Sequence, residues 1–345
     1  MSVLQQMEST SCPDCPICSS HGNLIYEELE DRLFNVPGLW NISKCSNSKC
    51  GLLWLNPMPT ETDIPKAYAH YYTHDVIKPP FGLLNRIAEA ASEGYVDVSY
   101  GYKAQGNRLL KVLMSVFVFL HPGRKVDVDY SVIWQEKKSE GRLLEVGCGS
   151  GHVLKHMQSL GWNVTGVDFD PKAVAFASNQ GLDVRLGSLA EQSFQSNYFD
   201  LVFMSHVIEH VHAPLALLKA SFEVLKPGGR LVLLTPNSES LWHRVFGRNW
   251  MSLDPPRHLH LFNKSTITQL ASRLGFTTVS VQSIVRDANG GFLGSRNIMV
   301  SGRHDMSNFP SFRMRLIGRW AQFIEWLINL FLRNHGEDIL LIAEK

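Results

Sequence analysis

Apolar and polar positions follow two different patterns along this chain, and the pattern changes near Gly141. Beyond this residue, short apolar runs take turns with segments whose apolar residues recur at helical spacing. This succession predicts alternating strands and helices, and therefore a parallel sheet with helices on both faces. We expect strands at 142–146, 163–167, 184–186, 201–205, 230–235, 277–285 and 339–343, and helices at 152–160, 171–180, 214–225 and 265–274.

The chain before Gly141 lacks this alternation. Residues 23–44 contain short apolar stretches that suit small strands, and two prolines within 56–60 break any regular element. Residues 82–120 have a mostly helical pattern, and a polar linker then runs to Gly141. We therefore divide the chain into a module at 1–60, a helical connecting segment at 61–140 and an α/β domain at 141–345.

A further helical pattern is inserted into the α/β domain at about 310–334. Within 312–333, large apolar residues recur at helical spacing, and four arginines with one acid, Glu325, lie on the other face. Basic amphipathic helices with tryptophan are typical of membrane-surface elements, but amphipathic helices also pack as caps over a sheet. The pattern alone leaves both interpretations open.

Composition narrows the class of protein. With 345 residues, 44% of them hydrophobic and 19% charged, the chain is neither disordered, nor a coiled coil, nor collagen-like. A net charge of +1 provides no overall attraction to nucleic acid. The first residues lack the basic and apolar regions of a secretory signal, and no apolar run reaches the roughly 18 residues that span a bilayer. We expect a cytoplasmic protein, with membrane-peripheral contact through 312–333 as the open alternative.

The cysteines are concentrated at one end, since five of the six lie in the first 50 residues. Without a secretory signal, such a cluster indicates a metal site before disulfides. Cys15 and Cys18 form one close pair and Cys45 and Cys50 a second, so the two pairs can close a tetrahedral Cys₄ zinc site. Cys12 with Cys15 is an overlapping alternative pair. A closed Cys₄ site has no open position, so we predict a structural zinc ribbon.

A glycine-rich loop follows the first strand of the α/β domain. The segment 145–151 reads EVGCGSG and leads directly into a helix, whose N-terminal N–H groups can face an anion. Asp168 ends the second strand about 20 residues later, where an acid can bind the hydroxyls of a ribose. No Gly-Lys-Ser/Thr of a phosphate-binding P-loop follows, and His152 stands where a dinucleotide fingerprint needs its third glycine. The pattern therefore predicts a site for a nucleoside-bearing ligand.

Four motifs in this region resemble those of the class I S-adenosylmethionine-dependent methyltransferases. LLEVGCGSG is similar to their first motif and GVDFDP to the acidic end of their second strand, while FDLV and LKPGG resemble their fourth-strand motif and the turn before their fifth strand. The resemblance covers roughly 141–285 and returns at the last strand. It implies a Rossmann-like methyltransferase sheet, with the zinc ribbon and added helices, and S-adenosylmethionine as cofactor.

The resemblance also implies roles for matching positions. The 147–151 loop would hold the methionine part of the cofactor, Asp168 the ribose hydroxyls, and Phe169 would lie against the adenine. Ser188 stands where the family often has aspartate, and Cys148 is ordinary for the motif and serves loop packing. The expected cofactor set is Glu145, Gly147, Cys148, Gly149, Ser150, Gly151, Asp168, Phe169, Ser188, Leu189 and Ser205.

The second half of the domain carries several histidines. The combination HVIEHV, KPGG, TPN and PPRHLHLF is similar to a bacterial methyltransferase subgroup that includes quinone O-methyltransferases and many enzymes of unknown substrate found among surface-polysaccharide functions. The zinc ribbon followed by CGLLWLNPMPT also resembles a recurrent variant of this subgroup. This second resemblance covers most of the chain.

Transfer of a methyl group to a hydroxyl needs a base, and histidine suits that role. His258 is our first candidate because it lies in a segment that could close over the substrate. His206 follows, since it directly succeeds the fourth strand and strand ends face the ligand crevice. We expect His210 to be structural.

A metal is the alternative use of these histidines. It would employ His206, Glu209 and His210 with His258 or His260, as the RNA 3′-end 2′-O-methyltransferases use ExxEH and a distant histidine for magnesium. Here His206 replaces the first glutamate of that motif, which makes the set less suited to a hard cation.

We therefore expect an S-adenosylmethionine-dependent methyltransferase that acts on an oxygen of a small or lipid-linked acceptor such as a saccharide. One alternative is a quinone-type O-methyltransferase. Another is methylation of RNA or protein held by the zinc ribbon, although no basic run with interleaved aromatics supports nucleic-acid binding. The last is a non-enzymatic binding module with a vestigial cofactor pocket.

Overall fold

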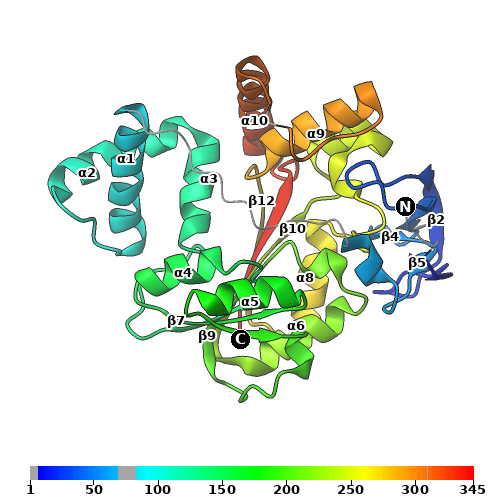
Figure 1. Cartoon of the computed structure of the whole chain (residues 1–345), viewed down its shortest axis with the longest axis horizontal. Helices are drawn as coiled ribbons and strands as arrows, with labels where there is room; N and C mark the ends of the chain where they lie inside the picture. The colour runs from blue at the N-terminus through cyan, green and yellow to red at the C-terminus, as the bar shows by residue number, and fades with distance from the viewer. Residues whose placement is uncertain (1–6, 69–82, 309) are drawn as a thin grey trace. The chain divides into compact units, whose positions relative to one another are not determined.

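The computed structural model describes residues 7–68, 83–308 and 310–345 (Figure 1). The chain forms two compact units. The first contains Met1–Tyr72, Ser205–Phe222 and Leu233–Ala343, and the second contains Thr73–Met204, Glu223–Val232 and Glu344–Lys345. The domain boundaries at 60 and 140 stay a prediction from the sequence.

A seven-stranded sheet has the strand order β12-β13-β10-β9-β6-β7-β8. Strand β6 pairs in parallel with both β7 and β9, and β7 pairs in parallel with β8. This confirms the Rossmann-like α/β class. The strands are β6 Arg142–Val146, β7 Asn163–Asp168, β8 Asp183–Leu186, β9 Phe199–Ser205, β10 Leu225–Pro236, β12 Thr278–Ile284 and β13 Asp338–Glu344. The helices that alternate with them are α4 His152–Ser159, α5 Pro171–Asn179, α6 Pro214–Val224 and α8 Lys264–Arg273.

The strands of this sheet are nearly continuous apolar runs. Leu143 and Leu144 of β6 are completely buried, as are Leu201, Val202 and Phe203 of β9. Parallel strands covered on both faces require such runs, because neither face of the strand meets water. The apolar pattern therefore located these strands to within a few residues.

The N-terminal module forms a second, four-stranded sheet with the order β11-β4-β3-β2. Its outermost strand β11, His260–Leu261, comes from the histidine-rich segment and pairs antiparallel with β4, with His260 opposite Trp54. The sequence analysis did not predict this pairing, because a two-residue strand has no periodicity. The other strands are β2 Gly22–Leu29, β3 Trp40–Cys45 and β4 Leu53–Leu55, and a separate small sheet joins β1 Ser9–Thr10 to β5 Met58–Pro59.

The second unit contains the predicted connecting helices and one more. They are α1 Leu83–Tyr100, α2 Arg108–Met114, the 3₁₀ helix η2 Ser115–Leu120 and α3 Pro122–Ser131. The prediction of a polar linker was wrong for α3. The His121 side chain accepts the Arg124 N–H at the start of this helix, and Val128 is buried against Ala91 and Tyr95 of α1.

The histidine-rich segment and the C-terminal part of the first unit are mainly helical. The elements are η4 Ile208–His210, α7 Leu241–Phe246, η5 Gly247–Asn249, η6 Met251–Leu253, α9 Ala288–Ser301 and α10 Phe312–Leu332. Helix α10 matches the predicted insertion and packs against α9 (Figure 1). Glu325, expected on the exposed face beside the arginines, is instead buried. Among the described residues, no helix is long and apolar enough to cross a membrane.

Candidate functional site

The glycine loop has the backbone that its sequence requires. Gly147, Gly149 and Gly151 have φ angles of 69°, 52° and 74°, a region that favours glycine. A side chain at Gly149 would meet no atom within 4 Å, so a ligand can approach the backbone closely there. Helix α4 begins at His152, directly after Gly151, without a side-chain cap, so its N-terminus can face an anion.

Asp168 links the end of β7 to this loop. Its Oδ2 accepts the Gly149 N–H at 2.7 Å, and its Oδ1 accepts the Asp170 N–H at 2.9 Å. Burial raises the pKa of the carboxyl group above its usual value. Phe169, the predicted adenine neighbour, is exposed directly after it. The structure thus brings the acid and the glycine loop together within one unit.

Glu145 lies on β6 in the same unit and is buried. Burial and the nearby charge of Asp168 raise its pKa well above the usual value. Its Oε2 has no hydrogen-bond partner within the described part of the chain, which leaves a buried polar atom for a ligand. Burial also raises the pKa of the Cys148 thiol, which packs against Gly166 of β7 and is therefore unreactive.

The remaining predicted cofactor residues are less clearly placed for binding. The Ser188 backbone N–H and hydroxyl both donate to Glu191 Oε2, at 2.6 and 2.9 Å, so this side chain is already engaged. Leu189 is buried, and the Ser150 carbonyl accepts a hydrogen bond from Gln180. Ser205 ends β9 and belongs to the first unit.

His206 has carboxylates around its ring. Its Nδ1 lies 3.2 Å from Glu209 Oε1, while its Nε2 lies 3.4 Å from Asp287 Oδ2 and 3.9 Å from Asp338 Oδ1. Burial alone would lower the pKa of His206, but Asp287 and Glu209 raise it well above its usual value. The ring is therefore held as a cation, which cannot accept a further proton.

His258 and His210 are uncharged, in contrast to His206. His258 Nδ1 lies 2.7 Å from the Ser252 carbonyl oxygen, and His210 Nδ1 lies 3.0 Å from that of Arg257. Since a carbonyl only accepts, each Nδ1 carries the proton and each Nε2 keeps its lone pair. Burial lowers the pKa of both rings to about 4, so both are neutral. The rings meet edge to face, with centroids 4.7 Å apart.

A buried ion pair holds the segment that carries His258. Arg257 is fully buried, and its two Nη atoms donate to the two oxygens of Asp31 at 2.8 Å each. Its Nε donates to Asp254, and both carboxylates raise its pKa even though burial opposes them. This pair could not be predicted from the sequence, because Asp31 lies far from Arg257 along the chain in a region without a local motif.

Two clusters could hold a metal ion near the histidines. Glu209, His210 and His258 form one, and His206, Asp287 and Asp338 form the other, with ligand atoms within 4.8 Å of one another in each. The structure thus groups His206 with Asp287 and Asp338, although its Nδ1 also contacts Glu209 of the first cluster. His260 joins neither cluster, and its buried ring nitrogens have no partner among the described residues. Asp287 and Asp338 were missed because their neighbours in the fold are distant in sequence.

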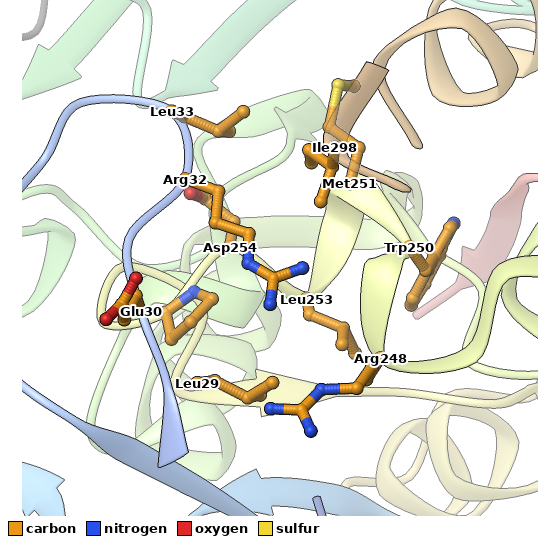
Figure 2. A pocket seen from close by; sticks show the side chains of 11 residues that line it. Leu29, Glu30, Arg32, Leu33, Arg248, Trp250, Met251, Leu253, Asp254 and Ile298 are labelled. Carbon is orange, nitrogen blue, oxygen red and sulfur yellow. The ribbon is translucent and has the colours of Figure 1, made fainter. Parts of the chain in front are cut away.

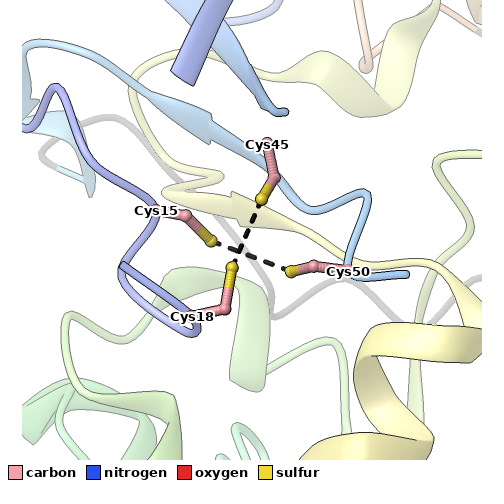
Figure 3. Close-up of side chains that lie close together, drawn as sticks. All are labelled: Cys15, Cys18, Cys45 and Cys50. Atoms are coloured by element: carbon pink, nitrogen blue, oxygen red, sulfur yellow. Dashed lines mark hydrogen bonds between the residues drawn. The ribbon is translucent and has the colours of Figure 1, made fainter. Parts of the chain in front are cut away.

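The four predicted cysteine ligands converge (Figure 3). The Sγ atoms are 3.8 Å apart for Cys15 and Cys50 and 3.4 Å apart for Cys18 and Cys45. Four sulfurs about 2.3 Å from one zinc ion would be about 3.8 Å apart, whereas a disulfide needs about 2.05 Å. Cys12 lies outside the cluster, and its Sγ donates to the Thr10 carbonyl instead. The thiols therefore fit one tetrahedral ion, and the alternative pair with Cys12 is not used.

Comparison with known proteins adds an independent view. The family described as "Methyltransferase domain" matches residues 123–281. The ubiquinone biosynthesis O-methyltransferase of Cereibacter sphaeroides is 34% identical over 131 residues, which are 36% of this chain and 53% of that protein. The same enzyme of Xanthomonas oryzae pv. oryzae is 37% identical over 125 residues, 34% of this chain and 52% of that one. The chain thus spans about half the length of the curated relatives it matches.

Solved structures are more distant. A SAM-dependent methyltransferase from Archaeoglobus fulgidus has a TM-score of 0.44 and 22% identity, covering 67% of this chain and 99% of that one. Phosphoethanolamine N-methyltransferase 2 of Haemonchus contortus has a TM-score of 0.45 and 19% identity, covering 85% and 62%.

Residues 123–281, which match the methyltransferase family, hold the glycine loop tied to Asp168 and the parallel strands around it, and together these observations support a class I S-adenosylmethionine-dependent methyltransferase domain in this part of the chain. Within that class, the chain is related to the quinone O-methyltransferases.

Proposed function

We propose that this protein transfers a methyl group from S-adenosylmethionine to an oxygen atom of a small or lipid-linked acceptor, such as a saccharide hydroxyl. The observation that carries the proposal is the state of His258. It is a neutral histidine with a free lone pair on Nε2, fixed by the Ser252 carbonyl and the adjacent Arg257 ion pair.

The residues of the second unit fit the cofactor. The carboxylate of Asp168 would accept hydrogen bonds from the ribose hydroxyls, and the unpartnered Glu145 oxygen would receive a donor from the methionine part. The N-terminus of α4 would face the methionine carboxylate. When bound, S-adenosylmethionine supplies a methyl group on a positively charged sulfur.

The acceptor's proton is the remaining chemical requirement. As the hydroxyl oxygen forms its bond to the methyl carbon and the carbon–sulfur bond breaks, the proton would pass to His258 Nε2. His206 is less suited to this task, because the surrounding carboxylates keep it protonated. The Cys₄ cluster would hold a structural zinc ion, since all four positions of the ion would be filled.

Changing His258 to alanine tests the base. We expect kcat to fall at least about 100-fold, the usual contribution of a positioned base, while the Kd for S-adenosylmethionine changes little. Turnover and cofactor binding are measured separately, and thermal unfolding shows whether loss of the bond to Ser252 disturbs the fold. His21→Ala, at an exposed histidine, is the matched control. Unchanged kcat in His258→Ala would remove His258 as the base.

The acceptor class can be tested directly. The protein is incubated with S-adenosylmethionine carrying a labelled methyl group and a lysate of its own host, and lipids, small molecules, protein and nucleic acid are then separated. We expect label in the lipid or small-molecule fraction. Label in protein or nucleic acid would contradict the proposal, and cofactor binding without label in any fraction would indicate a binding module.

A quinone-type acceptor is the second candidate. The ubiquinone biosynthesis O-methyltransferases among the relatives favour it. Identifying the labelled product by mass spectrometry distinguishes a methylated quinone precursor from a methylated saccharide.

A further inference from the structure

A pocket in the first unit is lined by two arginines that no metal or cofactor prediction uses. Arg32 follows β2, and Arg248 lies in η5. Figure 2 shows the guanidinium group of Arg32 beside Leu253 and that of Arg248 beside Leu29, among the residues that line the pocket. The complete lining is Leu29, Glu30, Arg32, Leu33, Arg248, Trp250, Met251, Leu253, Asp254, Pro255 and Ile298.

The two arginines have hydrogen bonds but no carboxylate partner among the described residues. Arg32 Nη1 donates to Asn249 Oδ1 at 2.5 Å, and Arg248 Nη2 donates to the Glu27 carbonyl at 3.1 Å. Each thus keeps donors for another acceptor. Burial and the neighbouring charge of Arg248 lower the pKa of Arg32, so an anion between the two groups would relieve their repulsion.

The acidic residues of the lining form no ion pair with Arg32 or Arg248 among the described residues, although the charge of Glu30 acts to raise the pKa of Arg32. Asp254 is engaged by Arg257 through two hydrogen bonds to its Nε. Glu30 is exposed, and Figure 2 shows its carboxylate at the pocket edge, apart from both guanidinium groups.

We propose that Arg32 and Arg248 bind a phosphate or diphosphate group of the acceptor. Guanidinium groups match phosphate oxygens in pairs, and apolar side chains form much of the remaining lining. Asp254 and residues of η5 and η6 line the pocket. Ser252 of the same η6 segment holds His258 through its carbonyl oxygen, which lies 2.7 Å from His258 Nδ1. This inference rests on the proposed function only in assigning the anion to the acceptor.

Calorimetric titration of the full-length protein with inorganic diphosphate, uridine diphosphate and geranyl diphosphate tests the pocket. We expect saturable binding that Arg248→Gln weakens at least tenfold, since a charged hydrogen bond is lost. Arg244→Gln, on the adjacent helix α7 but outside the pocket, is the control and should bind as the wild type does. Arg32→Gln tests the second proposed phosphate-binding arginine in the same way.

The titration separates the sources of the anion and the two proposals. Tighter binding of geranyl diphosphate indicates a lipid-linked acceptor, and tighter binding of uridine diphosphate a nucleotide-linked one. The proposal that Arg32 and Arg248 bind a phosphate group would be wrong if no ligand bound at millimolar concentration, or if Arg248→Gln and the wild type bound equally well. Neither result depends on methyl transfer, so the failure of one proposal remains distinguishable from that of the other.

A second, independent observation concerns helix α10. This helix buries its polar side and exposes its apolar side, whereas an ordinary surface helix does the opposite. The residues that it buries are small or polar, namely Gly318, Ala321, Gln322 and Glu325. Its large apolar residues face outward, with Phe312 69%, Trp320 65% and Phe331 82% exposed. Soluble helices normally turn the apolar side inward.

Polar contacts fix α10 in this orientation. Gln322 Nε2 donates to the Val285 carbonyl at 2.8 Å, and Asn329 Nδ2 donates to the Ser283 carbonyl at 2.8 Å. Gly318 lies so close to Asn289 that a side chain there would clash. The helix cannot turn its apolar side inward without breaking these contacts, and exposed apolar surfaces of this kind are typical of sites that bind a partner or a membrane.

The charges on α10 indicate which partner. Its arginines have no carboxylate partner among the described residues, and the one acid of the helix, Glu325, is buried with a pKa raised by burial and by Glu337. The exposed surface of the helix is therefore apolar and cationic. We infer that α10 lies on an anionic membrane surface, with Trp320 at the level of the headgroups. The arginines are Arg313, Arg315 and Arg319 of the helix and Arg333 directly after it.

Flotation of the full-length protein with vesicles tests this surface. We expect binding to vesicles that contain phosphatidylglycerol and little binding to pure phosphatidylcholine. Trp320→Ser with Phe331→Ser should reduce the partition coefficient at least tenfold, and Arg315→Gln with Arg319→Gln about fivefold for each arginine. Val300→Ser, at an exposed apolar residue of α9, is the control.

Two results would overturn the inference. One is the absence of vesicle binding. The other is a concentration-dependent dimer in light scattering that is abolished by Trp320→Ser, because a second copy would then cover the face.

Discussion

Replacing Asp168 with alanine is expected to abolish measurable binding of S-adenosylmethionine. The carboxylate ends β7, and the glycine loop that it holds through the Gly149 N–H is the proposed position of the cofactor. Two charged hydrogen bonds to ribose hydroxyls contribute about 1.5–3 kcal/mol each. Their loss corresponds to a Kd increase of at least about 100-fold. Calorimetry with S-adenosylmethionine measures this directly.

The same carboxylate also accepts the Asp170 N–H, so the variant could lose binding by loosening the loop. Asp168→Asn keeps the size of the side chain and removes the charge, and thermal unfolding without cofactor reports on the loop. Asp183→Asn, at an exposed aspartate of the edge strand β8, is the matched control and should bind normally. Retained affinity in Asp168→Ala would exclude the ribose assignment.

The sequence could predict the parallel sheet because its determinants are local. Buried parallel strands need unbroken apolar runs, and the glycine loop needs glycines at positions with positive φ, so both are visible in short segments. The elements that were missed have weaker local signals. Helix α3 is polar on most sides, and it is held by buried Val128 together with buried Asp129, which accepts hydrogen bonds from Tyr95 and Tyr100. Strand β11 has only two residues, and it pairs with β4.

The environment of the histidines could not be predicted for the same reason. Each histidine was visible, but its charge state depends on residues that only the fold brings near. Asp287, which the fold brings near, acts with Glu209 to make His206 a cation, whereas burial keeps His258 neutral. The sequence thus proposed two candidate bases, and the tertiary environment gives the two rings different charge states.

The cysteine module is connected to the segment that carries His258. Strand β11 completes the sheet of the module, and Asp31 binds Arg257 next to His258. In addition, the Cys50 carbonyl accepts hydrogen bonds from Asn263 Nδ2 and Thr266 Oγ1, at 3.1 and 2.5 Å. A disturbance at the cysteines is therefore expected to reach the proposed base.

Replacing Cys15 with serine is expected to remove the zinc ion and to lower both stability and turnover. Structural zinc is bound by about 10–16 kcal/mol in small zinc modules, so its loss leaves the module without its main crosslink. We expect a fall in Tm of about 10 °C or more, corresponding to a loss of several kcal/mol. Metal content by mass spectrometry, calorimetric Tm and kcat are measured on the same preparations.

Cys12→Ser is the matched control, because Cys12 belongs to the same segment but lies outside the cluster. It should keep its zinc, its Tm and its activity. If Cys15→Ser loses zinc and kcat while its Kd for S-adenosylmethionine stays normal, the module acts through the His258 segment and not through the glycine loop. Two results would contradict this prediction: a wild-type protein without zinc, or a Cys15→Ser variant with normal kcat and Tm. Either would show that the four thiols do not hold a zinc ion that stabilises the segment carrying His258.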